Sequence, residues 1–218
     1  MEHRVFIGWD EREVLPWHVL NHSIIRLASK PVSVTPVKLS QLPMSRPPSG
    51  STEFSLSRFL VPWMCGYQGL ALFMDCDMLV RCDITELFDM KDESAVQVVQ
   101  HDYVPRETVK FYGNKQVAYP RKNWSSVMLF DCGQCEALTP EYVDTAPASE
   151  LHQLLWTDSI GSLPVTYNHL VGEYPHRVDA KIVHWTNGGP WLMKYGNSDY
   201  NAEWYNERWR MVRYADEC

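Results

Sequence analysis

Five apolar residues, Leu70–Met74, constrain the fold of this chain more than any other segment, because two carboxylates follow them directly. A continuous apolar run of this length indicates a strand that is buried on both faces. Asp75 and Asp77 then stand two residues apart at the carboxyl end of that strand. In open α/β sheets, ligands bind at this edge. The segment therefore predicts an α/β fold with a polar site in the middle of the chain.

The rest of the 218 residues alternates strand-length apolar runs with helical patterns, which favours a sheet flanked by helices. Neither a repeat nor a linker long enough to separate two domains interrupts this order. We therefore expect one α/β domain over residues 1–218, in which residues 196–218 form a C-terminal helical tail. The expected strands are Arg4–Gly8, Val32–Leu39, Leu70–Met74, Ala95–Val99, Val127–Phe130, Val165–Tyr167 and Lys181–His184.

Helices are expected between these strands. The first is predicted to begin after Asp10, whose side chain would pair with Glu13 in a capping box. Leu20, Ile24 and Leu27 continue that helix at the spacing of one buried face. Further helices are expected at Thr52–Trp63, at Asp83–Phe88, after Pro140, and in a tail that contains Trp204 and Trp209. The tail is expected to pack back on the domain, and contact with a partner is the alternative.

The charge balance excludes some classes of partner. The chain has 20 Lys and Arg and 27 Asp and Glu, so its net charge is −7. A chain this acidic is a poor candidate for binding a nucleic-acid backbone. No run of about 18 or more apolar residues occurs, so no transmembrane helix is expected. Because no apolar signal region follows Met1, we expect a cytoplasmic protein in which Cys132 and Cys135 are free thiols.

Asp75 and Asp77 are the strongest chemical signal in the sequence. Two carboxylates this close repel each other unless a cation lies between them. A hard divalent cation such as Mn²⁺ or Mg²⁺ prefers oxygen ligands and bridges carboxylates to phosphate oxygens. The alternative is a polar turn after a strand, because Asp is common in turns.

A second segment near the C-terminus offers a nitrogen ligand and two glycines. His184 ends a short apolar strand, and Gly188 and Gly189 follow within five residues. Mn²⁺ accepts an imidazole beside carboxylates. Glycines let a backbone approach a phosphate closely. His184 is therefore a candidate third metal ligand, although a lone His is more often packed or solvated.

Together the two segments resemble the metal site of glycosyltransferases with the GT-A fold. The resemblance points to the retaining family of glycogenin and the bacterial lipopolysaccharide galactosyl- and glucosyltransferases, glycosyltransferase family 8. Val5–Arg12 is similar to the opening strand of that family, and Ser57-Arg58 to its basic helix. Asn123–Phe130 is similar to a later strand entry, so the likeness extends over most of the chain.

The resemblance implies a single GT-A domain, Rossmann-like, with a mixed central sheet flanked by helices. It implies a metal-dependent hexosyltransferase that uses UDP-glucose or UDP-galactose and retains the anomeric configuration. The acceptor would be a saccharide, a lipid-linked sugar or a protein. Asp75, Asp77 and His184 would hold Mn²⁺ or Mg²⁺, and Arg58 and Asp158 would be catalytic. The implied donor-binding residues are Gly8, Asp10, Arg12, Arg58, Asp75, Asn123, Ser125, Ser126, Gly188 and Gly189.

Other interpretations remain open from the sequence. A haloacid dehalogenase-type phosphatase also has Asp-x-Asp after an apolar strand, and it would use Asp75 as its nucleophile. A nucleotidyltransferase and a non-enzymatic carbohydrate-binding module are further alternatives, and nine Trp residues suit the latter because sugars stack on aromatic rings. Single side chains also have structural alternatives. Instead of binding a ligand, Arg58 could form a surface salt bridge, Asp10 could cap a helix, and Asp158 could be a solvated residue of a loop.

Overall fold

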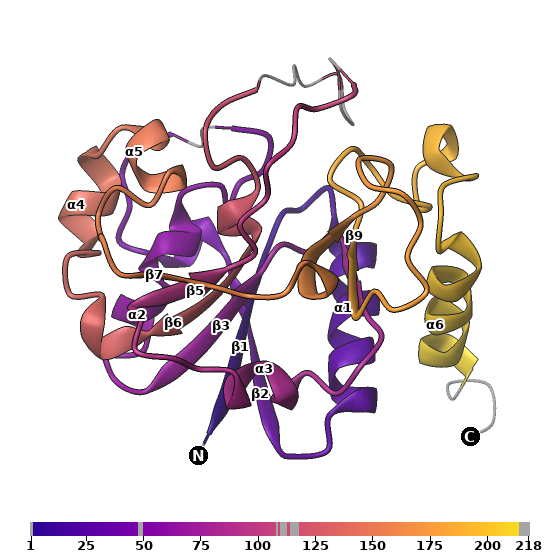
Figure 1. The fold of residues 1–218 in the computed structure, drawn as a ribbon, viewed down its shortest axis with the longest axis horizontal. Helices are drawn as coiled ribbons and strands as arrows, with labels where there is room; N and C mark the ends of the chain where they lie inside the picture. The colour runs from indigo at the N-terminus through magenta and orange to yellow at the C-terminus, as the bar shows by residue number, and fades with distance from the viewer. Residues whose placement is uncertain (1, 48–49, 108, 110–112, 114–117, 214–218) are drawn as a thin grey trace.

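The computed structural model describes residues 2–47, 50–107, 109, 113 and 118–213. Its main sheet consists of β1 (His3–Gly8), β2 (Val32–Val37), β3 (Leu70–Met74), β5 (Val96–Val98), β6 (Val127–Asp131) and β7 (Ile160–Ser162). The strand order is β2-β1-β3-β6-β5-β7 (Figure 1). β1 is parallel to β2 and β3, β6 is antiparallel to β3 and β5, and β7 is parallel to β5.

A smaller sheet consists of β4 (Met78–Val80), β8 (His169–Leu170) and β9 (Ile182–His184), in the order β4-β9-β8. β4 follows β3 after a short turn that contains the two aspartates. It runs antiparallel to β9, so that Met78 pairs with His184. This pairing brings the end of β3 and the end of β9 to the same place, although they lie far apart in the sequence.

The helices of the described residues are α1 (Val14–Leu27), α2 (Val61–Met64), α3 (Thr85–Asp89), α4 (Pro140–Thr145), α5 (Ala148–His152) and α6 (Asn201–Arg213). Single 3₁₀ turns are η1 (Leu39–Gln41), η2 (Ser57–Leu60), η4 (Trp124–Ser126), η5 (Cys132–Gln134), η6 (Val165–Asn168) and η7 (Met193–Tyr195). α1 contacts both β4 and α6, and Figure 1 shows it between the strands and α6. The expected mixed sheet flanked by helices is confirmed.

The main core lies between α1 and the first strands of the sheet. Leu20 and Ile24 of α1 are fully buried in the same apolar cluster as Val5 and Ile7 of β1 and Leu72 of β3. Full burial of such a side chain stabilises the fold by about 1.5–3 kcal/mol. The helical spacing in the sequence and the buried run of β3 thus build one core, and the end of β3 emerges from it.

A second apolar cluster lies between the small sheet and α6. Trp204 of α6 is fully buried there, together with Trp185 and Tyr200. Trp209, one turn further along the same helix, stays 55% exposed. Because indole burial removes a large apolar area from water, Trp204 fixes how α6 packs.

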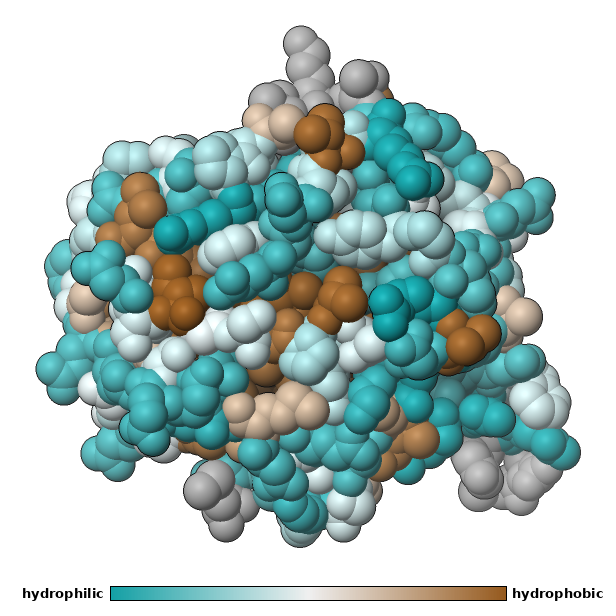
Figure 2. Space-filling model, in the orientation of Figure 1, coloured by the Kyte–Doolittle hydropathy of each residue, from teal (hydrophilic) through white to brown (hydrophobic). Residues whose placement is uncertain are grey.

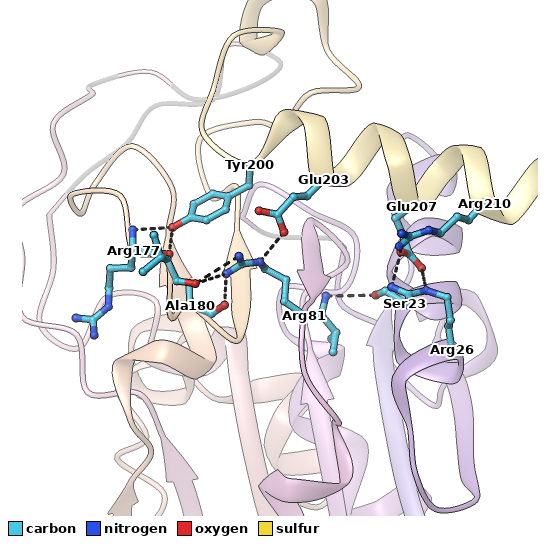
Figure 3. Close-up of polar contacts among 11 residues, drawn as sticks. Ser23, Arg26, Arg81, Arg177, Ala180, Tyr200, Glu203, Glu207 and Arg210 are labelled. Atoms are coloured by element: carbon cyan, nitrogen blue, oxygen red, sulfur yellow. Dashed lines mark hydrogen bonds and ion pairs between the residues drawn. The ribbon is translucent and has the colours of Figure 1, made fainter.

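Ion pairs also hold α6 against the domain (Figure 3). Glu207 is buried, and its carboxylate lies 2.7 Å from both Arg26 and His22 of α1. Arg81, which follows β4, lies 2.6 Å from Glu203. The C-terminal helix therefore packs back on the domain, as expected from the sequence.

The predicted capping box at the start of α1 was wrong. Glu13 occupies the N-cap position, and no side chain caps the helix there. Asp10 instead accepts hydrogen bonds from the backbone N–H groups of Arg12 and Glu53, at 2.9 and 3.1 Å. A long-range hydrogen bond to Glu53 thus replaces the local cap.

Other local predictions were also wrong. Instead of one helix, Thr52–Trp63 forms turns, then η2 and the start of the short helix α2. Val165–Tyr167 lies in η6, after Pro164, rather than in a strand. β4, β7 and β8 were not predicted. Strands of two or three residues give a weak periodic signal, and β5 and β9 were located through the longer predicted segments Ala95–Val99 and Lys181–His184.

The surface carries scattered apolar side chains. Figure 2 shows a face that is mostly hydrophilic, with separate apolar groups between polar ones. Isolated exposed apolar residues of this kind are normal in folded domains. Within the described ranges, none of the helices has the length and apolar character needed to cross a bilayer.

Candidate active site

A cavity of about 570 Å³ lies where β3 and β9 end and β6 begins. Seven residues named from the sequence line it, namely Arg58, Asp75, Asp77, Asn123, Ser125, Ser126 and His184. The remaining lining residues are Gly50, Ser51, Thr52, Phe54, Ser55, Tyr119, Lys122, Ala148, Ser149, His152, Gln153 and Thr186. The predicted polar site at the carboxyl end of β3 therefore coincides with a cavity large enough for a small-molecule ligand.

Asp75 is held in place by its backbone and by an arginine. Its N–H donates to the carbonyl of Ser126 at 2.9 Å, which continues the pairing between β3 and β6. Its carboxylate lies 2.7 Å from Arg58 Nη1. Arg58 is buried, and its guanidinium lies about 5 Å from the rings of Phe54 and Phe73. A guanidinium stacked on aromatic rings in this way keeps a fixed orientation toward Asp75.

Asp77 and His184 meet because β4 and β9 pair. The N–H of Trp185 donates to the carbonyl of Asp77 at 2.9 Å, just beyond the Met78–His184 pair. The Nε2 atom of His184 then lies 3.2 Å from Asp77 Oδ1. The other ring nitrogen, Nδ1, lies 2.9 Å from the side-chain oxygen of Asn168.

Asp75, Asp77 and His184 can hold a divalent cation. One ligand atom from each lies within 4.8 Å of the others. Two carboxylate oxygens and an imidazole nitrogen suit Mn²⁺, and carboxylates with water suit Mg²⁺. The turn between β3 and β4 directs both aspartates toward the same point, so the residues present fit the cation that the sequence predicted.

Cys76, between the two aspartates, points into the core instead. It is 1% exposed. Burial and the negative charge of Asp77 raise the pKa of this thiol well above its usual value. The thiol is therefore neutral, and a neutral thiol is neither a nucleophile nor a metal ligand.

Comparison with known proteins identifies the family. No protein-family model matches the chain. Protein CDI of Arabidopsis thaliana is 43% identical over 220 residues, which cover 94% of this chain and 85% of that protein. The chain belongs to the Protein CDI family.

Solved glycosyltransferases share the fold of this CDI-family chain. The bifunctional glycosyltransferase WbbM matches with a TM-score of 0.68 at 16% identity, over 98% of this chain and 51% of WbbM. GlyE of Streptococcus pneumoniae matches with 0.64 at 16% identity, over 95% and 61%. The galactosyltransferase LgtC, solved with donor and acceptor sugar analogs, matches with 0.59 at 10% identity, over 94% and 95%. The chain spans about half the length of WbbM. The resemblance to GT-A glycosyltransferases is confirmed at the level of the fold.

In the CDI-family chain, Asp10 and Arg12 lie behind the cavity wall and do not line it. Arg12 is 2.6 Å from Asp10 and donates to the carbonyl of Ser51 at 2.9 Å. Burial alone would raise the pKa of Asp10, but hydrogen bonds from Arg12 and Glu53 outweigh burial and hold that pKa below its ordinary value. The charged pair therefore shapes the segment near Ser51, which does line the cavity.

The three glycines named from the sequence are closely packed. A Cβ atom on Gly8 would lie 2.3 Å from the ring of Phe54, and one on Gly189 would lie 2.0 Å from the ring of Trp191. Gly188 has a φ of 122° and borders a small hollow next to Asp77. Gly188 is thus the one of the three nearest to the predicted metal ligands.

Asp158, predicted as catalytic, is exposed in the loop before β7 and does not line the cavity. The structure therefore places it apart from the seven residues that meet there.

Lys122 and His152 are among the lining residues that the sequence analysis did not name. Lys122 is 5% exposed, and its Nζ lies 4.5 Å from the ring centre of Tyr119. His152, at the end of α5, lies 2.9 Å from the hydroxyl of Ser125. Lys122 precedes Asn123 directly, which was the one signal available in the sequence. Nothing local marks His152, because α5 is short and irregular in pattern.

Proposed function

We propose that this chain is a metal-dependent glycosyltransferase that moves a hexose from a nucleotide-sugar donor to an acceptor. The observation that supports this proposal is that Asp75, Asp77, His184 and Arg58 line the same cavity in a protein with the GT-A fold. UDP-glucose or UDP-galactose is the proposed donor. The acceptor is a saccharide, free or attached to a lipid or a protein, and the product retains the donor's anomeric configuration.

Asp75, Asp77 and His184 would hold Mn²⁺, or Mg²⁺ in its place. A bound divalent cation would neutralise the charge on the departing nucleoside diphosphate. The side chains of Asp75 and Asp77 are 15% and 14% exposed, so each faces the cavity but is mostly buried. Partial burial strengthens their interaction with a cation, because water screens it less.

Arg58 is placed to orient the donor. Its side chain is 6% exposed, and one Nη1 atom contacts both the carboxylate of Asp75 and the carbonyl of Ser125. A guanidinium has five N–H donors, and those turned to the cavity would hold diphosphate or sugar oxygens. Lys122 adds a second positive charge to the same wall.

The amide and hydroxyl groups near Asn123 and Ser125 would fix the donor's sugar. Asn123 has a φ of 62°, and its side-chain amide donates to the hydroxyl of Tyr103 at 2.6 Å. That contact leaves the carbonyl oxygen of the amide as an acceptor for a sugar hydroxyl. Because Asp158 lies outside the cavity, the proposal gives it no part in the transfer.

The phosphatase alternative has lost its structural basis. It required a haloacid dehalogenase-type fold, whereas the observed fold is that of GT-A glycosyltransferases. The proposed nucleophile, Asp75, is also held by Arg58 through one carboxylate oxygen. A carbohydrate-binding module remains an outcome of the experiment below.

Calorimetric titration with UDP, in the presence and absence of Mn²⁺, tests the proposal. We expect binding that requires Mn²⁺ and that is lost in Asp77→Asn, because the amide weakens the cation site. Asp89→Asn is the matched control, since Asp89 forms an exposed ion pair with Lys30. If neither UDP nor GDP binds with Mn²⁺ present while free sugars do, the protein is a carbohydrate-binding module instead.

Product analysis then tests the transfer itself. Incubation with UDP-hexoses and Mn²⁺ is expected to release UDP, and NMR of the glycoside formed is expected to show the donor's anomeric configuration. An inverted anomeric centre would contradict the retaining assignment.

A further inference from the structure

A chain of buried hydrogen bonds leads from the cavity wall to the side of His184 that faces away from Asp77. It contains three residues, Ser126, Asn168 and His184, each of which is at most 1% exposed. None of the roles assigned above uses Asn168, and the sequence analysis did not single it out. A fully buried amide between two other polar groups needs an explanation, because burial makes every unpaired polar atom costly.

The directions of these hydrogen bonds follow from their chemistry. The hydroxyl of Ser126 donates to the carbonyl of Asn123 at 2.7 Å, so it can only accept from Asn168. The Nδ2 atom of Asn168 donates to that hydroxyl at 2.8 Å. The amide oxygen of Asn168 must then point the other way, where it lies 2.9 Å from Nδ1 of His184. An oxygen acceptor requires that Nδ1 carry a proton.

We propose that Ser126 and Asn168 are positioning residues, which keep a proton on Nδ1 of His184 and so reserve Nε2 for the cation. This inference rests on the proposed function in one respect, the identity of the cation. Metal-bound histidines in proteins commonly donate their second N–H to a fixed acceptor, which sets the tautomer and the ring orientation. Here the acceptor is a neutral amide, whose own orientation depends on a single hydroxyl.

Ser126 also contacts Asp75, the candidate metal ligand at the end of β3. Its carbonyl accepts from the N–H of Asp75 at 2.9 Å, while its hydroxyl orients Asn168. Ser126, the last residue of η4 just before β6, therefore positions both Asp75 and, through Asn168, His184. The resemblance had implied that Ser126 contacts the donor. With its hydroxyl engaged inside the protein, we assign Ser126 to holding the metal ligands instead.

Removal of the Ser126 hydroxyl releases the amide of Asn168. Without that acceptor, the amide can rotate and present its NH₂ group to Nδ1 of His184. Nδ1 would then have to be unprotonated, and the proton would move to Nε2, where it blocks a metal. Ser126→Ala is therefore expected to change the protonated nitrogen and the metal affinity together.

The first test reads the proton directly in the metal-free protein. Nitrogen-15 NMR identifies which ring nitrogen of His184 is protonated, and His184→Gln assigns the signal. We expect a protonated Nδ1 in the unaltered protein and an unprotonated Nδ1 in a substantial fraction of Ser126→Ala. An unprotonated Nδ1 in the unaltered protein would overturn the proposal.

The second test measures Mn²⁺ affinity without nucleotide, from the electron paramagnetic resonance signal of the free ion. Ser126→Ala and Asn168→Leu are expected to weaken binding by about 10–100-fold. Asn168→Asp should restore it, because a carboxylate also accepts the proton of Nδ1. Ser23→Ala is the matched control, since Ser23 is also fully buried and its hydroxyl also donates to a backbone carbonyl, that of Leu20, but does not contact Asn168. Equal affinities for Ser126→Ala and Ser23→Ala would refute the proposal.

The two tests separate this inference from the proposed function. If the unaltered protein does not bind Mn²⁺, the proposed function fails, and the NMR result alone decides on the proton of His184. If Mn²⁺ binds but Asn168→Asp does not restore the affinity lost in Asn168→Leu, the site stands and the positioning role is wrong.

Discussion

At the scale of single residues, the candidate site depends on side chains whose surroundings allow one orientation. Arg58 lies against Phe54 and Phe73, and this packing directs its Nη1 atom to Asp75 and to the carbonyl of Ser125. Phe54 in turn packs on Gly8, which leaves no room for a side chain there. Gly8, which the resemblance implied as a donor-binding residue, therefore makes room for the Phe54 ring against which Arg58 packs.

Gly8→Ala is expected to destabilise the protein by about 1–3 kcal/mol, because the added methyl group would collide with Phe54. The displaced ring would also move Arg58, and UDP binding should weaken. Chemical denaturation and calorimetry measure the two effects. Gly133→Ala is the control, since its Cβ would lie 3.6 Å from the nearest atom. Equal stability of the two variants would contradict this packing role.

At the scale of elements, short strands carry the residues of the candidate site, and the two longest helices keep these strands in position. β4 and β9 have three residues each, and their pairing places Asp77 beside His184. Strands this short are stable only when their neighbours hold them. α1 contacts β4, and α6 covers α1, so the two long helices keep the small sheet in position.

Glu207→Gln is expected to loosen α6 and lower the free energy of unfolding by about 2 kcal/mol, because buried hydrogen bonds to charged groups are lost. Its side chain is 3% exposed, and its carboxylate pairs with Arg26 and His22. Faster hydrogen exchange in α6 would show the loosening. In Glu203→Gln, whose side chain is 44% exposed, a much smaller effect is expected. Equal effects of both substitutions would argue against the buried pair as the main polar contact of α6.

At the scale of the whole molecule, the candidate site lies between two apolar clusters. Asp75 follows a strand of the main cluster, whereas His184 precedes Trp185 of the second cluster. The ligands therefore meet only when both clusters are packed together. Two buried histidines, His101 and His169, lie in this part of the fold and make its stability depend on pH.

Burial lowers the pKa of His101 to about 3 and that of His169 to about 4. Both rings are neutral in the folded protein, whereas in the unfolded chain they take up protons below about pH 6.5. The free energy of unfolding should therefore fall as pH decreases from about 6.5 to 4, by about 1 kcal/mol per pH unit for each ring.

His169→Phe tests this dependence. The ring of His169 packs near Tyr174 and Tyr200, and neither of its nitrogens has a hydrogen-bond partner among the described residues. The substitution is expected to flatten the pH dependence of unfolding measured by denaturant titration. Leu155→Phe, at a side chain that is 58% exposed and carries no titratable group, should leave the slope unchanged. An unchanged slope in His169→Phe would refute the assignment.

The sequence by itself was enough to determine the features that depend on neighbouring residues. The apolar run Leu70–Met74 predicts a buried strand, and the two aspartates after it predict a polar site at its end. Helical spacing predicts α1, and the alternation of patterns predicts a sheet flanked by helices. These signals are local, because burial and backbone geometry impose a period on consecutive residues.

Only the tertiary structure decided which distant residues complete the site. Asp77 meets His184 through the antiparallel register of β4 and β9, and β4 was not predicted from the sequence. Asn168 reaches both Ser126 and His184 from a 3₁₀ turn, and Lys122 and His152 join the wall from irregular segments. Such contacts depend on how separate elements pack, and packing depends on the shapes of many side chains at once. The residue types that bind a cation could therefore be named from the sequence, whereas the residues that orient them could not.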